Sequence, residues 1–318
     1  IFVLNLFIIC FCARLALSLY CKQYAKMKKN ILFLIITFLS SAIAFAEDTF
    51  FQYPQAPESL NSLSQRANYV VIHFWDKCNL KSAFSSRKKM KKAFIDYVTY
   101  MQYASSDTIY TSIDKLIKEV QKSPKNMLYL AEIAEETLYS DSALFWSDEL
   151  YLPFATAITQ TKKISKAEKA RYAHQATVLK NSSIGTTAPS FEYTTPNGNK
   201  QHFDSIKAPA IILFFNDPDC IDCRLAKVRL ATDTNLNKLI DAGVIKIASI
   251  YPGIADDSWK NEVADYPKNW IIGACENIYE LFDMRTTPSI YQLDNKHKIV
   301  AKNLNVDGIL MVVNNIKL

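Results

Sequence analysis

Residues 210–223, AIILFFNDPDCIDC, decide the fold of the second half of the chain. The run 210–215 is apolar throughout and has the length of a strand, which is the pattern of a strand buried in a parallel sheet. A turn that contains Pro218 follows, and Cys220 and Cys223 then stand three residues apart. The stretch predicts a buried strand, a tight turn and a helix with two cysteines in its first turn.

The spacing of the two cysteines suits thiol–disulfide exchange. Side chains three residues apart on a helix lie on one face, close enough to form a disulfide. Cys220, at the start of the helix, would receive free backbone N–H groups and the positive end of the helix dipole, which favour a thiolate. We therefore predict that Cys220 is the nucleophile and that Cys223, about one turn in, is more buried and resolves the mixed disulfide. A client would also meet Asp219, Ile221 and Asp222 beside the cysteines.

A second motif, RTTPS at 285–289, precedes a predicted strand. Proline cannot donate a hydrogen bond to a sheet, so Pro288 marks a special position. Combined with the cysteine pair about 65 residues upstream, the motif predicts a cis Thr287–Pro288 bond facing the cysteines, with the Thr287 backbone free for an extended substrate strand. The alternative is an ordinary trans proline at a strand start.

Strands and helices are expected in a regular order around these motifs. A strand at 190–194 comes first, and a helix at 220–242 and a strand at 244–251 follow the cysteine motif. Short helices are expected at 258–264 and 276–282, then a hairpin of 289–293 with 298–302, and a closing helix at 306–314. This is the element order of thioredoxin.

Three stretches carry a family resemblance: TAPSF at 187–191, ILFFNDPDCIDC at 212–223 and MRTTPSIYQLD at 284–294. Together they resemble the thioredoxin-like proteins of the TlpA and ResA type. The resemblance implies an α/β domain over residues 185–318, with a central mixed sheet flanked by helices. It also implies extracytoplasmic thiol–disulfide oxidoreductase activity on protein thiols and disulfides, supported by an electron donor or acceptor. The redox-active disulfide Cys220–Cys223 would be the working group, without a further cofactor or metal.

The sequence departs from that family around the motif. Asp219 stands where members often have Trp, Phe214 where many thioredoxins have an acid, and Ala226 where the ResA type carries Glu. The usual proton acceptor for the buried thiol is therefore missing. Asp217, Asp219 or Asp222 could take its place, or each could be a solvated loop charge. Carboxylates near a thiol also oppose thiolate formation.

The N-terminal residues predict export. Residues 27–46 combine a positive start, a nine-residue apolar run at 31–39 and the A-x-A pattern that ends at Ala46, as in a signal peptide cleaved after Ala46. This predicts a periplasmic protein. An uncleaved membrane tether is the alternative, although the apolar run 31–46 is shorter than the roughly 20 residues of a spanning helix. Residues 1–26 are interpreted as an upstream extension, with translation starting at Met27.

Residues 47–182 predict an all-α domain. Apolar residues recur at helical spacings, and the segment contains no glycine. Ser123 before Pro124 has the pattern of a helix N-cap. The stretch RANYVVIHFWD at 66–76 resembles the start of a helical domain of unknown function that precedes thioredoxin-like domains in secreted Gram-negative proteins, a resemblance that implies no chemistry.

The net charge and the remaining cysteines argue against two other functions, nucleic-acid binding and zinc binding. After residue 46 the chain has 32 basic and 31 acidic residues, which gives no broad electrostatic reason to bind nucleic acid. A zinc site would need two more ligands beside the cysteine pair, and Cys275, His202 and His297 each stand alone. A structural Cys220–Cys223 disulfide remains an alternative, as does a non-catalytic or redox-gated binding module whose helical domain recognises a partner. Cys275 is interpreted as a small buried residue or a regulatory thiol.

Overall fold

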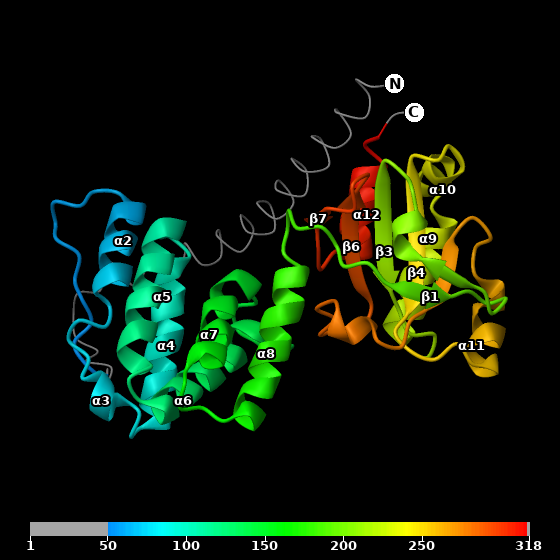
Figure 1. The fold of residues 1–318 in the computed structure, drawn as a ribbon. Coiled ribbons are helices and arrows are strands. Elements are labelled where there is room, and N and C mark those ends of the chain that lie inside the picture. The colour runs from blue at the N-terminus through cyan, green and yellow to red at the C-terminus, as the bar shows by residue number, and fades with distance from the viewer. Residues whose placement is uncertain (1–49, 317–318) are drawn as a thin grey trace. The chain divides into compact units, whose positions relative to one another are not determined.

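The computed structural model describes residues 50–316 (Figure 1). The described chain divides into two compact units, the first ending at Thr177 and the second beginning at Val178. The predicted signal peptide and upstream extension, residues 1–46, lie outside the described residues. Within 50–316, no helix has both the length and the apolar character needed to cross a membrane.

The first unit is built from helices, as predicted. They are α2 (Leu63–His73), α3 (Leu80–Ala83), α4 (Arg87–Met101), α5 (Ser106–Val120), α6 (Pro124–Ala134), a π-helix (Glu135–Tyr139), α7 (Asp148–Gln160) and α8 (Lys166–Asn181). Serine side chains cap five of them, and Ser123 accepts a hydrogen bond from the backbone N–H of Asn126 at the start of α6, as expected from the sequence. Such caps satisfy backbone donors that have no partner inside the helix.

Buried aromatic residues form the core of the helical unit. Phe74, Phe94 and Tyr97 are fully buried. The Tyr97 hydroxyl donates to Ser112 Oγ (2.6 Å), which donates to the Val71 carbonyl (2.7 Å), and these two bonds link α2, α4 and α5. Phe74, Phe94 and Tyr97 are therefore core residues, whereas Tyr100 and Tyr110 are exposed.

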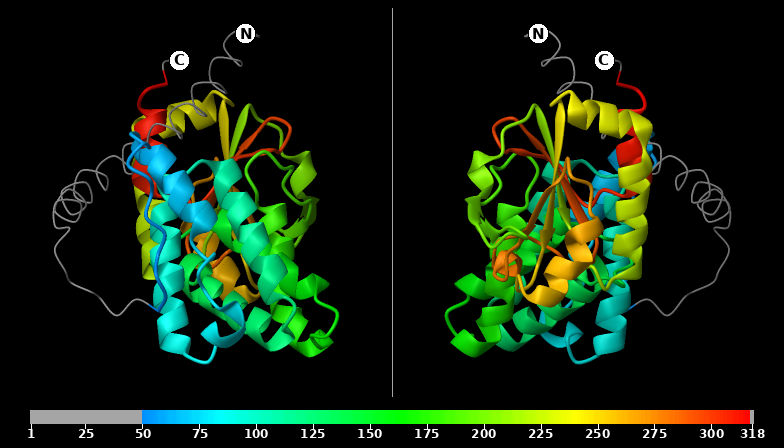
Figure 2. Two further views of the ribbon diagram at one scale, coloured as in Figure 1. Left: turned by 90° about the vertical axis from the view of Figure 1, so that its left-hand side faces the viewer. Right: turned by 90° about the vertical axis from the view of Figure 1, so that its right-hand side faces the viewer.

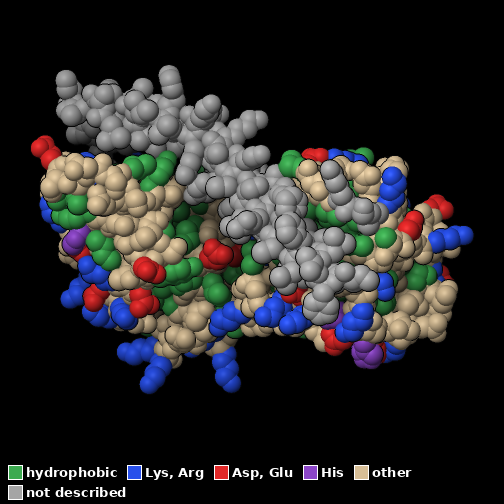
Figure 3. Space-filling model, turned by 90° about the horizontal axis from the view of Figure 1, so that it is seen from above, with side chains coloured by type: hydrophobic (Ala, Val, Ile, Leu, Met, Phe, Trp, Pro, Cys, Tyr) green, Lys and Arg blue, Asp and Glu red, His purple; other side chains and the backbone are tan. Residues whose placement is uncertain are grey.

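The basic start of α4 lies against acidic side chains. Lys91 Nζ is 2.6 Å from Glu136 Oε2 and Arg87 Nη1 is 3.7 Å from Glu132 Oε2. Figure 3 shows Lys and Arg side chains interspersed with Asp and Glu on the face in view. Exposed pairs of this kind contribute little to stability, and they fit a solvated surface.

The second unit is a seven-stranded mixed sheet. Its strands are β1 (Glu192–Thr194), β2 (Lys200–His202), β3 (Ala210–Phe215), β4 (Ile245–Tyr251), β5 (Ile271–Ala274), β6 (Ser289–Asp294) and β7 (Ile299–Ala301), in the order β2-β1-β5-β4-β3-β6-β7. Strands β3, β4 and β5 are parallel, and β6 is antiparallel to β3. The carboxyl ends of the three parallel strands therefore meet at one edge of the sheet, which is where the cysteine motif follows β3.

Central strand β3 is buried on both faces, as its apolar run predicted. Ile212 and Phe214 pack in one cluster with α9 (Ile221–Thr232), α10 (Thr234–Asp241) and α12 (Val306–Val313). The alternate residues Ile211, Leu213 and Phe215 face a second cluster on the other side of the sheet. Figure 2 shows the strands from two further sides, with helices packed along the sheet.

Several predicted elements need correction. The helix expected at 220–242 is two helices, because Asp233 is extended and its carboxylate accepts from Leu236 N (2.8 Å), which starts a new helix. The helix expected at 276–282 is only a 3-10 turn, Ile278–Glu280, and the first strand starts at Glu192 rather than 190. Strands β2 and β5 were not predicted. Each has only three or four residues, so it carries too little periodicity to stand out.

Candidate active site

Cys220 occupies the N-cap of α9, directly after the turn that leaves β3. The backbone N–H of Cys223 donates to Cys220 Sγ (3.2 Å), and the Cys220 N–H donates to the Asp217 carbonyl (3.0 Å). The sulfur of Cys220 thus accepts a hydrogen bond from one of the amides that have no partner inside the helix.

The two cysteines differ in exposure, in the direction expected from the sequence. Cys220 is partly exposed, whereas only 2% of Cys223 is accessible. Burial raises the pKa of the Cys223 thiol to about 12, and the neighbouring Cys220 and the charge of Asp217 act in the same direction. The backbone amide of Asp217 partly opposes this rise in pKa. Cys223 therefore needs help to lose its proton, because a desolvated thiolate is unfavourable.

The threonine–proline loop lies against the first cysteine. The Thr287–Pro288 peptide bond is cis, as the sequence led us to expect. Cys220 Sγ lies 3.6 Å from the Thr287 carbonyl oxygen. The loop and the cysteine pair, about 65 residues apart in sequence, therefore form one site. The roles of Thr287 and Pro288 in docking a substrate stay predictions.

A buried ion pair directly precedes this loop in the chain. Arg285 Nη2 lies 2.7 Å from Asp283 Oδ2, and the two side chains are only 9% and 2% exposed. The backbone N–H of Asp283 donates to Ser182 Oγ (2.9 Å), and the Tyr291 hydroxyl donates to the Asp283 carbonyl. Sequence reasoning missed Asp283, since two opposite charges two residues apart give no sign of being buried.

Sequence reasoning also missed a polar cluster beneath the cysteine turn. The Asn216 side chain is 2% exposed and donates to the Phe214 carbonyl (3.2 Å) and Ser249 Oγ (2.7 Å). Its Oδ1 accepts from the Tyr266 hydroxyl (3.0 Å), and Lys227 Nζ lies 4.3 Å from the centroid of the Tyr266 ring. This Asn216 cluster ties the turn to β4 and to the chain near Tyr266. Its members lie 33 and 50 residues from Asn216, so no local pattern could reveal them.

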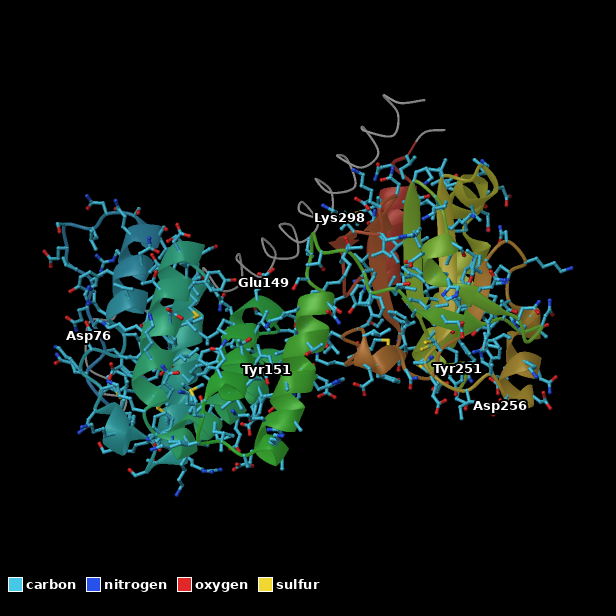
Figure 4. The ribbon with its side chains drawn as sticks, in the orientation of Figure 1. Asp76, Glu149, Tyr151, Tyr251, Asp256 and Lys298 are labelled. Atoms are coloured by element: carbon cyan, nitrogen blue, oxygen red, sulfur yellow. The ribbon has the colours of Figure 1, made fainter. Side chains whose placement is uncertain are left out.

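The three aspartates of the motif lie in different surroundings. Asp217 is half-buried and its Oδ1 accepts from the Asp219 N–H (2.9 Å), while Asp219, Asp222 and Ile221 are exposed beside the cysteines. Burial raises the pKa of Tyr251, at the carboxyl end of β4, and the charge of Asp217 adds to this rise. Figure 4 shows Tyr251 and Asp256 near each other in this part of the unit.

The other two described cysteines, Cys78 and Cys275, belong to other segments than the Cys220–Cys223 motif. Cys78 belongs to the helical unit, and burial raises its pKa to about 11. Cys275 follows β5, donates its backbone N–H to the Tyr251 carbonyl (2.9 Å) and has a pKa raised by burial. All four cysteines within 50–316 are free thiols. In the same range, no three potential metal-ligating His, Cys, Asp or Glu side chains gather.

Comparison with known proteins places the chain in a family. A family model described as a domain of unknown function, DUF5106, matches residues 24–182, half of the 318 residues. The chain belongs to the DUF5106 family. The comparison with curated proteins gives no match.

Solved structures support the thioredoxin-like fold. A thioredoxin-like protein from Bacteroides caccae is 25% identical, with a TM-score of 0.71 over 83% of this chain and 98% of that one. The C-terminal domain of an uncharacterized protein from Bacteroides fragilis is 27% identical over 42% of this chain and 99% of that one (TM-score 0.40). The thioredoxin domain of a thiol-disulfide oxidoreductase from Bacteroides vulgatus is 21% identical over 42% and 96% (TM-score 0.36). The match to the Bacteroides caccae structure shows that the second unit of this DUF5106 protein has a thioredoxin-like fold.

Proposed function

We propose that this DUF5106 protein is an extracytoplasmic thiol–disulfide oxidoreductase of the TlpA and ResA type. The supporting observation is the arrangement of two unequal thiols. A partly exposed Cys220 sulfur accepts the Cys223 amide at a helix start and lies 3.6 Å from the Thr287 carbonyl, with the buried Cys223 one turn behind it. An accessible, amide-stabilised sulfur beside a second sulfur is what disulfide exchange requires.

The proposed reaction has two steps. The Cys220 thiolate attacks a client disulfide and forms a mixed disulfide, releasing one client thiol. Cys223 then attacks Cys220 Sγ, which forms the Cys220–Cys223 disulfide and releases the second client thiol. The client disulfide is reduced and the enzyme dithiol is oxidised, and the reverse sequence oxidises a client. The direction depends on the potential of the electron donor or acceptor that recycles the pair.

Client binding is assigned to the surface around Cys220. The backbone of Thr287, in the loop that ends at Pro288, would pair with an extended client segment. Asp219, Ile221 and Asp222 are exposed beside the sulfur, and 65% of Ile221 is accessible. An apolar side chain with acidic neighbours would contact the residues that flank the client cysteine.

Reduction of insulin disulfides tests the proposal. We expect the Cys220→Ser variant to lose activity, because the attacking sulfur is gone. The matched Cys275→Ser variant should keep it, because Cys275 is half-buried after β5 and has no part in the exchange. Activity at the normal level in the Cys220 variant would end the proposal.

A binding module with an inert disulfide is the second candidate. The observation that favours it is the environment of Cys223, whose pKa of about 12 and acidic neighbour both oppose a thiolate. Measurement of the reduction potential separates the two functions, because a value below about −300 mV is typical of a structural disulfide. If the disulfide instead gates binding by the helical domain, partner pull-downs should differ between oxidised and reduced protein.

A further inference from the structure

Cys223 lacks the acidic residues that the resembled families carry near the buried thiol. Phe214 and Ala226 occupy these positions, and both pack in the apolar cluster between β3 and α9. Yet Cys223 must lose its proton before it attacks, because the thiolate is the nucleophile. The acceptor therefore has to come from another part of the site.

Asp217 is the motif aspartate that the fold holds in place. Asn216, directly before it, is anchored by the three hydrogen bonds of the Asn216 cluster. Pro218, directly after it, is buried, and its carbonyl accepts from Arg224 Nη1 of α9 (3.2 Å). Asp217 thus sits half-buried between two fixed neighbours, whereas Asp219 and Asp222 are exposed.

A hydrogen bond holds Asp217 beside Cys220, and the charge of its carboxylate acts on Cys223. Its carbonyl accepts from the Cys220 N–H, and its Oδ1 accepts from Asp219 N. Its carboxylate charge adds to the raised pKa of Cys223, Tyr251, Tyr266 and Tyr279. Of the three motif aspartates, Asp217 is the one whose charge bears on Cys223.

We propose that Asp217 accepts the proton of Cys223 when this thiol attacks the mixed disulfide at Cys220. The inference rests on the proposed function. The proton passes from Cys223 Sγ to the Asp217 carboxylate as the Cys223–Cys220 bond forms. The bond from Cys220 to the client sulfur breaks, the client leaves as a thiolate that takes up a proton, and Asp217 returns its proton to water. In the reverse direction, protonated Asp217 supplies the proton to the departing Cys223.

Other groups that face the buried thiol have to be considered in any pH dependence. Cys220 lies on the same helix start, and Tyr266 and Tyr279 interact electrostatically with Cys223 from the segments around 263–266 and 278–280. Lys227, one turn beyond Cys223, covers the Tyr266 ring. Burial raises the pKa of Tyr266 to about 12, so this phenol stays protonated at neutral pH and does not compete as an acceptor.

Two roles of the Asp217 carboxylate predict opposite effects of its removal. As a charge alone, it raises the pKa of Cys223, so the Asp217→Asn variant would hold more Cys223 thiolate and resolve the mixed disulfide faster. As a proton acceptor it speeds this step, and the same variant would be slower. Asparagine keeps an Oδ1 that can accept from Asp219 N, so the turn is preserved in either case.

The test follows release of thionitrobenzoate from its symmetric aromatic disulfide, using exported protein with Cys78→Ser and Cys275→Ser. The first release reports attack by Cys220, and the second reports attack by Cys223 on the mixed disulfide. We expect Asp217→Asn to slow the second phase by about tenfold or more at neutral pH, since general base catalysis typically contributes 10²–10⁴-fold. The difference in second-phase rate between the unmodified site and Asp217→Asn should become smaller as pH rises, because hydroxide then takes the proton of Cys223 in place of Asp217. The matched variant Asp241→Asn, at the end of α10, should leave the second phase within about twofold.

Each other outcome has a defined meaning. A second phase that is unchanged or faster in Asp217→Asn would overturn the inference, and so would equal slowing of both phases at every pH, which indicates a displaced turn. Absence of the first phase in the unmodified site would contradict the proposed function instead, so the two failures are distinguishable.

Discussion

At the scale of single residues, Cys220 and Cys223 lie in different environments although they are only three positions apart. Cys220 lies at the N-cap, where an amide stabilises its sulfur, while Cys223 faces the interior. Asn216 anchors the turn between β3 and Cys220 through hydrogen bonds to Phe214, Ser249 and Tyr266. These two environments support two predictions.

Cys223 should titrate as a buried thiol. With Cys78, Cys220 and Cys275 replaced by Ser in the exported protein, we expect thiolate ultraviolet absorbance at a midpoint well above 9.0, because burial raises its pKa. The folded state then keeps a proton that the unfolded state loses near pH 9, so the free energy of unfolding falls as pH rises from about 9 toward 12. Unfolding in urea should return the midpoint to about 9. A folded midpoint at or below 9 would contradict the burial argument.

Asn216 should contribute to stability through its three side-chain bonds. Asn216→Ala leaves the Tyr266 hydroxyl without its buried acceptor, and we expect a loss of about 2–3 kcal/mol in the free energy of unfolding. Asn199→Ala, in the exposed turn between β1 and β2, is the matched control and should change it by less than about 0.5 kcal/mol. Urea denaturation measures both. Similar losses in the two variants would argue against a structural role for the Asn216 cluster.

At the scale of elements, the N-terminus of α9 combines a stabilised sulfur with exposed acids. Asp219 and Asp222 flank Cys220 on either side, and both are exposed. Helix amides and carboxylates act on the sulfur in opposite directions. The balance between the helix amides and the two carboxylates should therefore affect how fast charged disulfides react with Cys220.

Charged disulfides should react at different rates with Cys220. We expect cationic cystamine to react faster than an anionic disulfide of similar size, because Asp219 and Asp222 repel the anion. Replacing either with Asn should reduce the rate ratio by about threefold, corresponding to less than 1 kcal/mol for an exposed charge pair, and salt should reduce it further. Asp241→Asn, at the end of α10 by the opposite edge of the sheet, is the control. Stopped-flow rates that do not depend on salt would contradict this expectation.

At the scale of the whole molecule, the chain joins a helical unit of the DUF5106 family to a thioredoxin-like unit. Helix α8 runs through the boundary between them, since Thr177 and Val178 both lie within it. Each unit has its own buried core, as expected of a domain. Export of the pair to an oxidising compartment stays a prediction from the N-terminal residues.

Processing of the N-terminus is open to direct measurement. We expect protein recovered from the periplasm to begin at Glu47, because the A-x-A pattern ends at Ala46. N-terminal sequencing and intact mass would identify the first residue. An alanine-to-leucine exchange at Ala44 and Ala46 should block cleavage. Protein that retains the apolar run in the unmodified chain would support the membrane tether instead.

The sequence by itself determined the fold class and the position of the cysteine pair at a helix start. An apolar run, a cysteine pair and a proline loop are local signals, because strand burial, helix starts and turn geometry depend on neighbouring residues. The same signals failed for β2 and β5, which are too short to show a period, and for the helix break at Asp233, where a side-chain cap interrupts a continuous pattern.

Only the tertiary structure decided which distant residues contact Cys220 and the turn before it. Thr287 reaches Cys220 across 67 positions, and Ser249 and Tyr266 reach Asn216 across 33 and 50. It also separated Asp217 from Asp219 and Asp222, three identical residue types within six positions. Hydrogen bonds and desolvation depend on distances between elements packed in space, and such distances are set by strand order and helix packing rather than by any local pattern.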